Sequence, residues 1–118
     1  MEKKTILVAE DEAIILMDIK SSLKKEGYSV VTALRLDSAM KQVKQKSIDL
    51  LISDLNLGGE NGIMPLLNYM KEFEPEIPVI LYSGTDRHKP KENPYCHSYV
   101  VKGTGMNNLI SEVERLTR

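Results

Sequence analysis

Short β-type runs alternate with helix-length segments along almost the whole chain, and this alternation restricts the possible folds more than any other feature. Several runs are continuously apolar, as strands buried on both faces of a sheet are. Alternating strands and helices form βαβ units, whose right-handed crossovers give a doubly wound parallel sheet with helices on both faces. We therefore predict an α/β fold. The runs are residues 5–9, 29–34, 50–53, 79–82 and 98–101.

Apolar side chains at helical spacing predict the helices that lie between and after these runs. Gly27 is expected as a left-handed cap and Asp37 as an N-cap. Pro90 and Pro94 disfavour helix, so residues 84–98 are expected to form at most a short helical turn. The stripes are Leu16, Ile19 and Leu23; Leu36, Ala39, Met40 and Val43; Ile63, Leu66, Leu67, Met70 and Phe73; and Met106, Leu109, Ile110, Val113 and Leu116.

Length and charge narrow the function classes. The 118 residues are expected to form one domain, 1–118. A net charge of −1 gives no basic surface for direct nucleic-acid binding. Residues 6–9 are too short an apolar run for a signal or a membrane span, so we expect a cytoplasmic protein without membrane association. The single cysteine, Cys96, excludes an internal disulfide.

Polar residues follow four of the predicted strands, at the sheet edge where α/β folds bind ligands. Glu10 and Asp11 follow the first run, Asp54 the third, Ser83 the fourth and Lys102 the fifth. Carboxylates that meet at such an edge repel unless a hard cation such as Mg²⁺ or Mn²⁺ lies between them. An aspartate there can attack phosphorus while the metal and a lysine neutralise charge. We predict this role for Asp54.

Each residue taken alone also has an ordinary structural explanation. Acids such as Glu10 and Asp11 suit the first turn of a helix, and Asp54 and Asn56 suit a glycine-rich turn. Lys102 and Ser83 are common at surfaces and in loops. The functional interpretation is favoured only because all of them fall at the same end of consecutive predicted strands with complementary charge.

The same residues resemble the receiver domains of two-component response regulators, from Ile6 to Leu116. In that family an acidic pair follows the first strand, and the phosphoacceptor aspartate, a Ser or Thr, and a lysine end the third, fourth and fifth strands. The resemblance implies a flavodoxin-like sheet of order 2-1-3-4-5. The matching residues are Glu10, Asp11, Asp54, Ser83 and Lys102.

The resemblance also implies a role for each residue. Asp54 would accept the phosphoryl group and pair with Lys102. The Ser83 hydroxyl would move to the phosphoryl group while Tyr99 turns inward. The metal would be bound by Asp11 directly, by Glu10 through water, by Asp54 and by the Asn56 backbone carbonyl.

The implied partners are a histidine kinase or histidine phosphotransfer protein and an unidentified downstream protein, with the chain a monomer or weak homodimer. Such a domain is not a conventional enzyme, because it catalyses only its own phosphorylation and dephosphorylation.

Three positions depart from the family pattern. Gly103 replaces the proline after the lysine, which predicts a trans bond and a shifted Lys102. Gly58 replaces a proline four residues after Asp54, and the segment 84–98 is short where the fourth helix belongs. These departures leave open a pseudo-receiver that binds partners without phosphorylation.

The sequence disfavours two other classes of α/β protein. A dehalogenase-type phosphatase needs a second acid where this chain has Asn56, which cannot exchange a proton in that role. A flavin domain needs an anion-binding loop where this chain has Glu10 and Asp11.

Overall fold

The computed structural model of the chain describes residues 3–84 and 95–118. Five parallel strands form one sheet of order β2-β1-β3-β4-β5, so the predicted fold class and topology are confirmed. Three of the strands have their predicted bounds, while β2 ends one residue earlier and β4 one residue later than predicted. The strands are β1 (Thr5–Ala9), β2 (Ser29–Ala33), β3 (Leu50–Ser53), β4 (Val79–Ser83) and β5 (Ser98–Val101).

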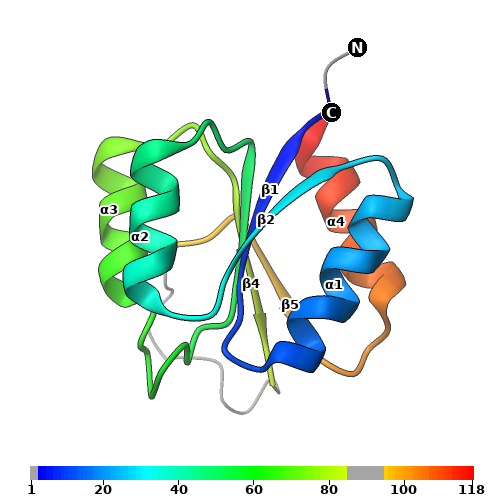
Figure 1. Ribbon diagram of the computed structural model, residues 1–118, viewed down its shortest axis with the longest axis horizontal. Coiled ribbons are helices and arrows are strands. Elements are labelled where there is room, and N and C mark those ends of the chain that lie inside the picture. The colour runs from blue at the N-terminus through cyan, green and yellow to red at the C-terminus, as the bar shows by residue number, and fades with distance from the viewer. Residues whose placement is uncertain (1–2, 85–94) are drawn as a thin grey trace.

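Helices cover both faces of the sheet (Figure 1). The helices α1 (Ala13–Lys25) and α4 (Met106–Thr117) lie on one face, and α2 (Leu36–Gln45) and α3 (Met64–Phe73) lie on the other. The prediction for residues 84–98 concerns mainly 85–94, which lie outside the described residues. None of the described helices is long and apolar enough to cross a membrane.

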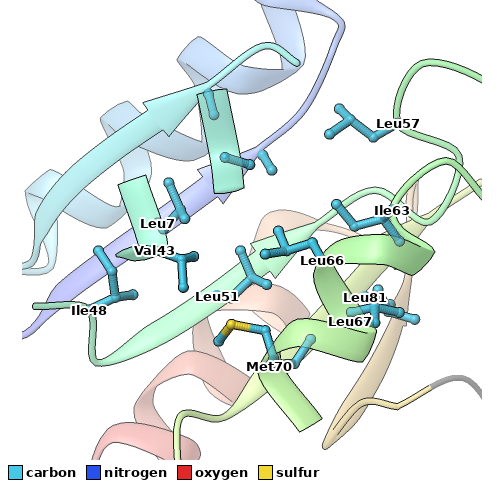
Figure 2. Close-up of a cluster of buried hydrophobic side chains, with 14 of the residues drawn as sticks. Leu7, Val43, Ile48, Leu51, Leu57, Ile63, Leu66, Leu67, Met70 and Leu81 are labelled. Atoms are coloured by element: carbon cyan, nitrogen blue, oxygen red, sulfur yellow. The ribbon is translucent and has the colours of Figure 1, made fainter. Parts of the chain in front are cut away.

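Each face of the sheet has its own hydrophobic core, because successive side chains of a strand point to opposite faces. Ile6 and Val8 of β1 belong to the core under α1 and α4. Leu7 between them belongs to the core under α2 and α3, where it lies with Leu51 and Leu66 (Figure 2). A slip of one residue in the register of a strand would turn each of its side chains to the opposite face, out of the core that it fills. The packing of the two buried cores therefore fixes the register of the sheet.

The predicted helix stripes are largely confirmed. Leu16, Ile19 and Leu23 of α1 are buried, as are Leu66, Leu67 and Met70 of α3. Phe73 was predicted on the same stripe as the α3 residues, and that prediction is wrong. Its side chain is 60% exposed and lies against the Tyr69 ring, with 5.0 Å between the ring centroids. Phe73 continues the helical spacing, but it is the last residue of α3 and its side chain is largely solvated.

The two predicted caps have opposite outcomes. Gly27 has φ +94° and donates its N–H to the Lys24 carbonyl, while the Tyr28 N–H bonds to the Leu23 carbonyl. This is a Schellman cap, and the prediction is confirmed. Asp37 is not an N-cap, because α2 begins two residues earlier than expected, after Arg35. Instead Asp37 lies in the first turn, paired with the Arg35 guanidinium at 2.7 Å.

Two substitutions on α3 distinguish its buried face from its exposed end. Leu66→Ala leaves a cavity in the core under α2 and α3, so we expect the free energy of unfolding to fall by about 2–5 kcal/mol. Phe73→Ala removes a largely solvated ring and should cost about 1 kcal/mol or less. Urea denaturation of both variants measures the difference, and equal losses would contradict the exposed placement of Phe73.

Candidate functional site

The carboxyl ends of β1, β3, β4 and β5 lie along one edge of the sheet, at the bottom of Figure 1. The register pairs Ala9 with Ser53, so Glu10 and Asp54, which follow them, leave the sheet side by side. The site residues predicted at this edge therefore meet. Carboxylate oxygens of Glu10, Asp11 and Asp54 all lie within 4.8 Å of one another.

Glu10 is the buried member of the cluster, with 1% of its surface exposed. Its Oε1 accepts the Glu12 backbone N–H at 3.1 Å, and its Oε2 lies 2.7 Å from the Lys102 Nζ. Burial raises the pKa of the Glu10 carboxyl above its ordinary value, while the Lys102 ammonium and the Glu12 N–H act in the opposite direction. Lys102 therefore compensates the charge of an acid that is nearly excluded from solvent.

Asp54 is the accessible carboxylate beside it. Its Oδ1 accepts the Asn56 backbone N–H at 3.1 Å, and its Oδ2 accepts a hydrogen bond from the Lys102 Nζ at 3.2 Å. Its side chain is 13% exposed, against 2% for that of Glu10. Of the two acids that Lys102 contacts, Asp54 is therefore the one that a donor in solution can reach.

Lys102 reaches the site despite the glycine that follows it. The Lys102–Gly103 bond is trans, as predicted, and Gly103 has φ +88°. The predicted shift of Lys102 is wrong, since its Nζ contacts both Glu10 and Asp54. Its backbone N–H donates to the Ser83 carbonyl at 2.6 Å, which continues the β4–β5 ladder by one residue. This bond sets the position of the lysine before its loop begins.

The charges around Lys102 reverse the usual effect of burial on an amine. Burial alone would lower the pKa of the Lys102 ammonium, but the hydrogen bonds and charges of Glu10 and Asp54 outweigh it and raise that pKa. Lys102 is therefore a permanent cation of the site at neutral pH.

The loop after Asp54 contacts Asp11 through its backbone. The Gly58 N–H donates to the Asp11 Oδ2 at 3.2 Å, and the Asn56 carbonyl accepts the Gly59 N–H at 3.1 Å. The Asn56 side chain accepts the Asn61 N–H at 2.9 Å. The Gly58 donor was not predicted from the sequence. Its signal was a glycine in place of a proline, since proline has no N–H to donate.

Ser83 and Tyr99 are placed on the opposite face of the sheet from Lys102. Ser83 ends β4 and is 2% exposed. Tyr99 pairs with Leu81 in the ladder and packs, partly buried, against the core under α2 and α3. Alternation along β4 places Ser83 on the same face as Leu81, and hence as Tyr99. The two residues of the predicted switch therefore share a face.

The donor set fits Mg²⁺. All the donors are hard oxygens, the ligands that Mg²⁺ prefers, and Asp11 and Asp54 both reach solvent. The formal charges of three carboxylates and one ammonium sum to −2, which one divalent cation would neutralise. The Asn56 carbonyl already accepts one hydrogen bond, but a carbonyl oxygen has two lone pairs.

Comparison with known proteins agrees with this geometry. A family model described as the response regulator receiver domain matches residues 6–114. The transcriptional regulatory protein PdtaR of Mycobacterium tuberculosis is 28% identical over 94% of this chain and 55% of its own length. A putative NtrX-like response regulator of Rickettsia typhi is 33% identical over 98% of this chain and 25% of its own length. The chain thus spans about half or less of these relatives.

Solved structures show the same fold over nearly the whole chain. The response regulator TrrA of Thermotoga maritima, in complex with Mg²⁺ and BeF, has a TM-score of 0.87 at 26% identity, covering 96% of this chain and 98% of that one. A response regulator receiver protein of Sinorhizobium medicae also has a TM-score of 0.87, at 27% identity, covering 98% and 95%.

The pairing of Lys102 with Glu10 predicts a pH effect. In Lys102→Gln the pKa of the Glu10 carboxyl, already raised by burial, should rise further. A raised pKa contributes stability that is complete below the ordinary value of 4.5 and is lost as the pH rises through the folded-state value. The variant should therefore lose stability, relative to the native chain, as the pH rises from 4.5 through the folded-state pKa of Glu10. Side-chain ¹³C NMR titration and urea denaturation against pH measure both effects.

Arg115→Gln is the matched control. It breaks the exposed pair with Glu112, whose pKa lies at about 2 because of its hydrogen bonds with Arg115 and Ser98. It should raise the pKa of Glu112 and leave that of Glu10 unchanged. An unchanged pKa of Glu10 in Lys102→Gln would contradict the compensating role of Lys102.

Proposed function

Because this chain belongs to the response regulator receiver domain family of two-component signalling, we propose that it takes up a phosphoryl group on the Asp54 carboxylate. The observation that supports this most directly is the placement of Asp54 between a fixed ammonium and the acidic cluster. We take residues 1–118 as one receiver domain. Glu10, Asp11, Asp54 and the Asn56 carbonyl would bind Mg²⁺, or Mn²⁺ in its place, with Glu10 acting through water.

The proposed reaction moves a phosphoryl group from an oxygen or nitrogen atom of the donor to an oxygen of Asp54. An oxygen of Asp54 forms a bond to phosphorus as the bond to the donor's leaving group breaks, and the electron pair leaves with that group. Mg²⁺ held by Glu10, Asp11 and Asp54 would supply positive charge to the oxygens of the phosphoryl group. Lys102 supplies a second positive charge, and its Nζ already lies 3.2 Å from the Asp54 Oδ2.

Lys102 also determines what changes when the phosphoryl group arrives. In the structure it divides its contacts between Glu10 at 2.7 Å and Asp54 at 3.2 Å. A phosphoryl group on Asp54 adds charged oxygens there, so we expect the Lys102 ammonium to shift from Glu10 toward Asp54. We propose that Ser83 then hydrogen-bonds a phosphoryl oxygen and that Tyr99 moves further inward. The signal is a shift in population between two arrangements of one fold.

Receiver domains are signalling modules and not classical enzymes. We propose that the donor is a histidine kinase or a histidine phosphotransfer protein, and that the phosphorylated domain binds a downstream protein. Its only catalysis would be its own phosphorylation and dephosphorylation. Several relatives are named transcriptional regulatory proteins, and the match spans about half of their length or less.

Intact mass measurement after incubation with acetyl phosphate tests the acceptor. We expect one phosphoryl adduct that requires Mg²⁺ and is absent in Asp54→Ala. Asp37→Asn is the matched control, since Asp37 is an exposed aspartate paired with Arg35 on α2, and it should retain the adduct. An adduct that persists in Asp54→Ala would place the acceptor elsewhere. A native chain that neither forms an adduct nor binds Mg²⁺ would favour the pseudo-receiver.

Calorimetric titration with Mg²⁺ tests the metal site separately. Asp11→Asn removes a charged oxygen that faces solvent, so we expect Mg²⁺ affinity to fall by about tenfold or more. The Gly58 N–H can still bond to the amide oxygen of the new side chain, so the loop should keep its place. Equal affinity in Asp11→Asn and Asp37→Asn would refute Asp11 as a ligand.

A further inference from the structure

Lys102 has to cross a whole strand to reach its partners. It follows β5, at the edge of the sheet, whereas Asp54 follows β3 and Glu10 follows β1. Strand β4 lies between β5 and β3, and both β3 and β4 lie between β5 and β1. Neighbouring strands lie about 4.7–4.9 Å apart. The lysine side chain therefore passes over β4, and the β4 side chain beneath it influences where the ammonium can go.

The last residue of β4 on this face of the sheet is Tyr82. The ladder pairs it with Val100, and both residues belong to the core under α1 and α4. Val100 lies two residues before Lys102, so Lys102 leaves the sheet on the same face. The Tyr82 ring is 7% exposed. The Lys102 Nζ lies 5.8 Å from its centroid, within the range of about 6 Å in which an aromatic face attracts a cation.

A competing position for the ammonium lies nearby. Tyr82 and Lys102 line a depression of about 410 Å³ together with Asp18, Ile14 and Met106. Asp18, on α1, is a second carboxylate that lines this depression. A lysine has a flexible stem of four carbons, so its direction has to be set by its surroundings.

From this arrangement we infer that Tyr82 is a positioning residue, whose ring directs the Lys102 ammonium toward Glu10 and Asp54. This inference rests on the proposed function for its consequence, which is faster phosphoryl transfer to Asp54. The ring acts through the lysine and need not touch the phosphoryl group. It favours the productive direction by attracting the cation and by filling space that the stem would otherwise sample.

The test compares Tyr82→Leu, which removes the ring, with Tyr82→Phe, which keeps it. NMR of the metal-free native chain should show contacts between the Lys102 methylenes and the Tyr82 ring protons, with ring-current shifts of those methylenes. The shifts should persist in Tyr82→Phe and disappear in Tyr82→Leu. Phosphorylation by acetyl phosphate should be about three- to tenfold slower in Tyr82→Leu and should recover in Tyr82→Phe.

Tyr69→Leu is the matched control. Tyr69 is a partly buried tyrosine, and the Nζ of Lys44 lies 5.3 Å from its ring centroid. It belongs to α3, which covers the face of the sheet opposite to Tyr82 and Lys102. Its loss should leave the Lys102 shifts and the phosphorylation rate unchanged, even where it lowers stability. Mg²⁺ affinity should be the same in all four proteins, since Tyr82 supplies no ligand.

Two results would overturn the inference. One is the absence of contacts between Lys102 and the Tyr82 ring in the native chain, which needs no variant to fold. The other is a Tyr82→Leu protein that is phosphorylated as fast as Tyr82→Phe. If the native chain takes up no phosphoryl group, the proposed function fails, and the NMR contacts and ring-current shifts still decide whether Tyr82 places Lys102.

Discussion

The site depends on one ammonium that joins acids from two strands. Glu10 is almost fully buried, and a buried charged carboxylate without a cation beside it would strongly destabilise the folded state. The Lys102 ammonium is that cation, with its Nζ 2.7 Å from the Glu10 Oε2. The same Nζ lies 3.2 Å from the Asp54 Oδ2. Stability and chemistry are therefore linked. The group that allows Glu10 to ionise in the interior is also the group that faces the proposed phosphoacceptor.

The sheet makes this contact possible through register and alternation. The strand residues that face α1 and α4 form one buried core. The alternation along each strand places three charged residues on that same face, namely Glu10, Asp54 and Lys102. A one-residue slip of β5 against β4 would turn Lys102 to the other face and bury polar groups among apolar ones. The apolar packing under α1 and α4 thus fixes the direction in which the charged residues leave the sheet.

Much of this could be predicted from the sequence, because strand ends and helix stripes are local patterns. Glu10, Asp11, Asp54 and Lys102 were placed together from strand ends alone, and the structure brings them together. The errors arose where a local pattern had two solutions. Asp37 suits both an N-cap and a first turn, and the Arg35 guanidinium selects the second. The path of Lys102 over Tyr82 could not be predicted, because it requires the strand order and the register together.

The glycines that depart from the family pattern are compatible with the same site. Gly58 has φ +74°, a conformation that proline cannot adopt, and its N–H bonds to Asp11, which proline could not do. A carboxylate has about four lone-pair positions, so this bond leaves Asp11 able to bind a cation. Gly103 has φ +88° across a trans bond and still leaves Lys102 on its partners. In this chain glycine conformations and backbone donors therefore shape both loops, while the side chains that bear charge keep their places.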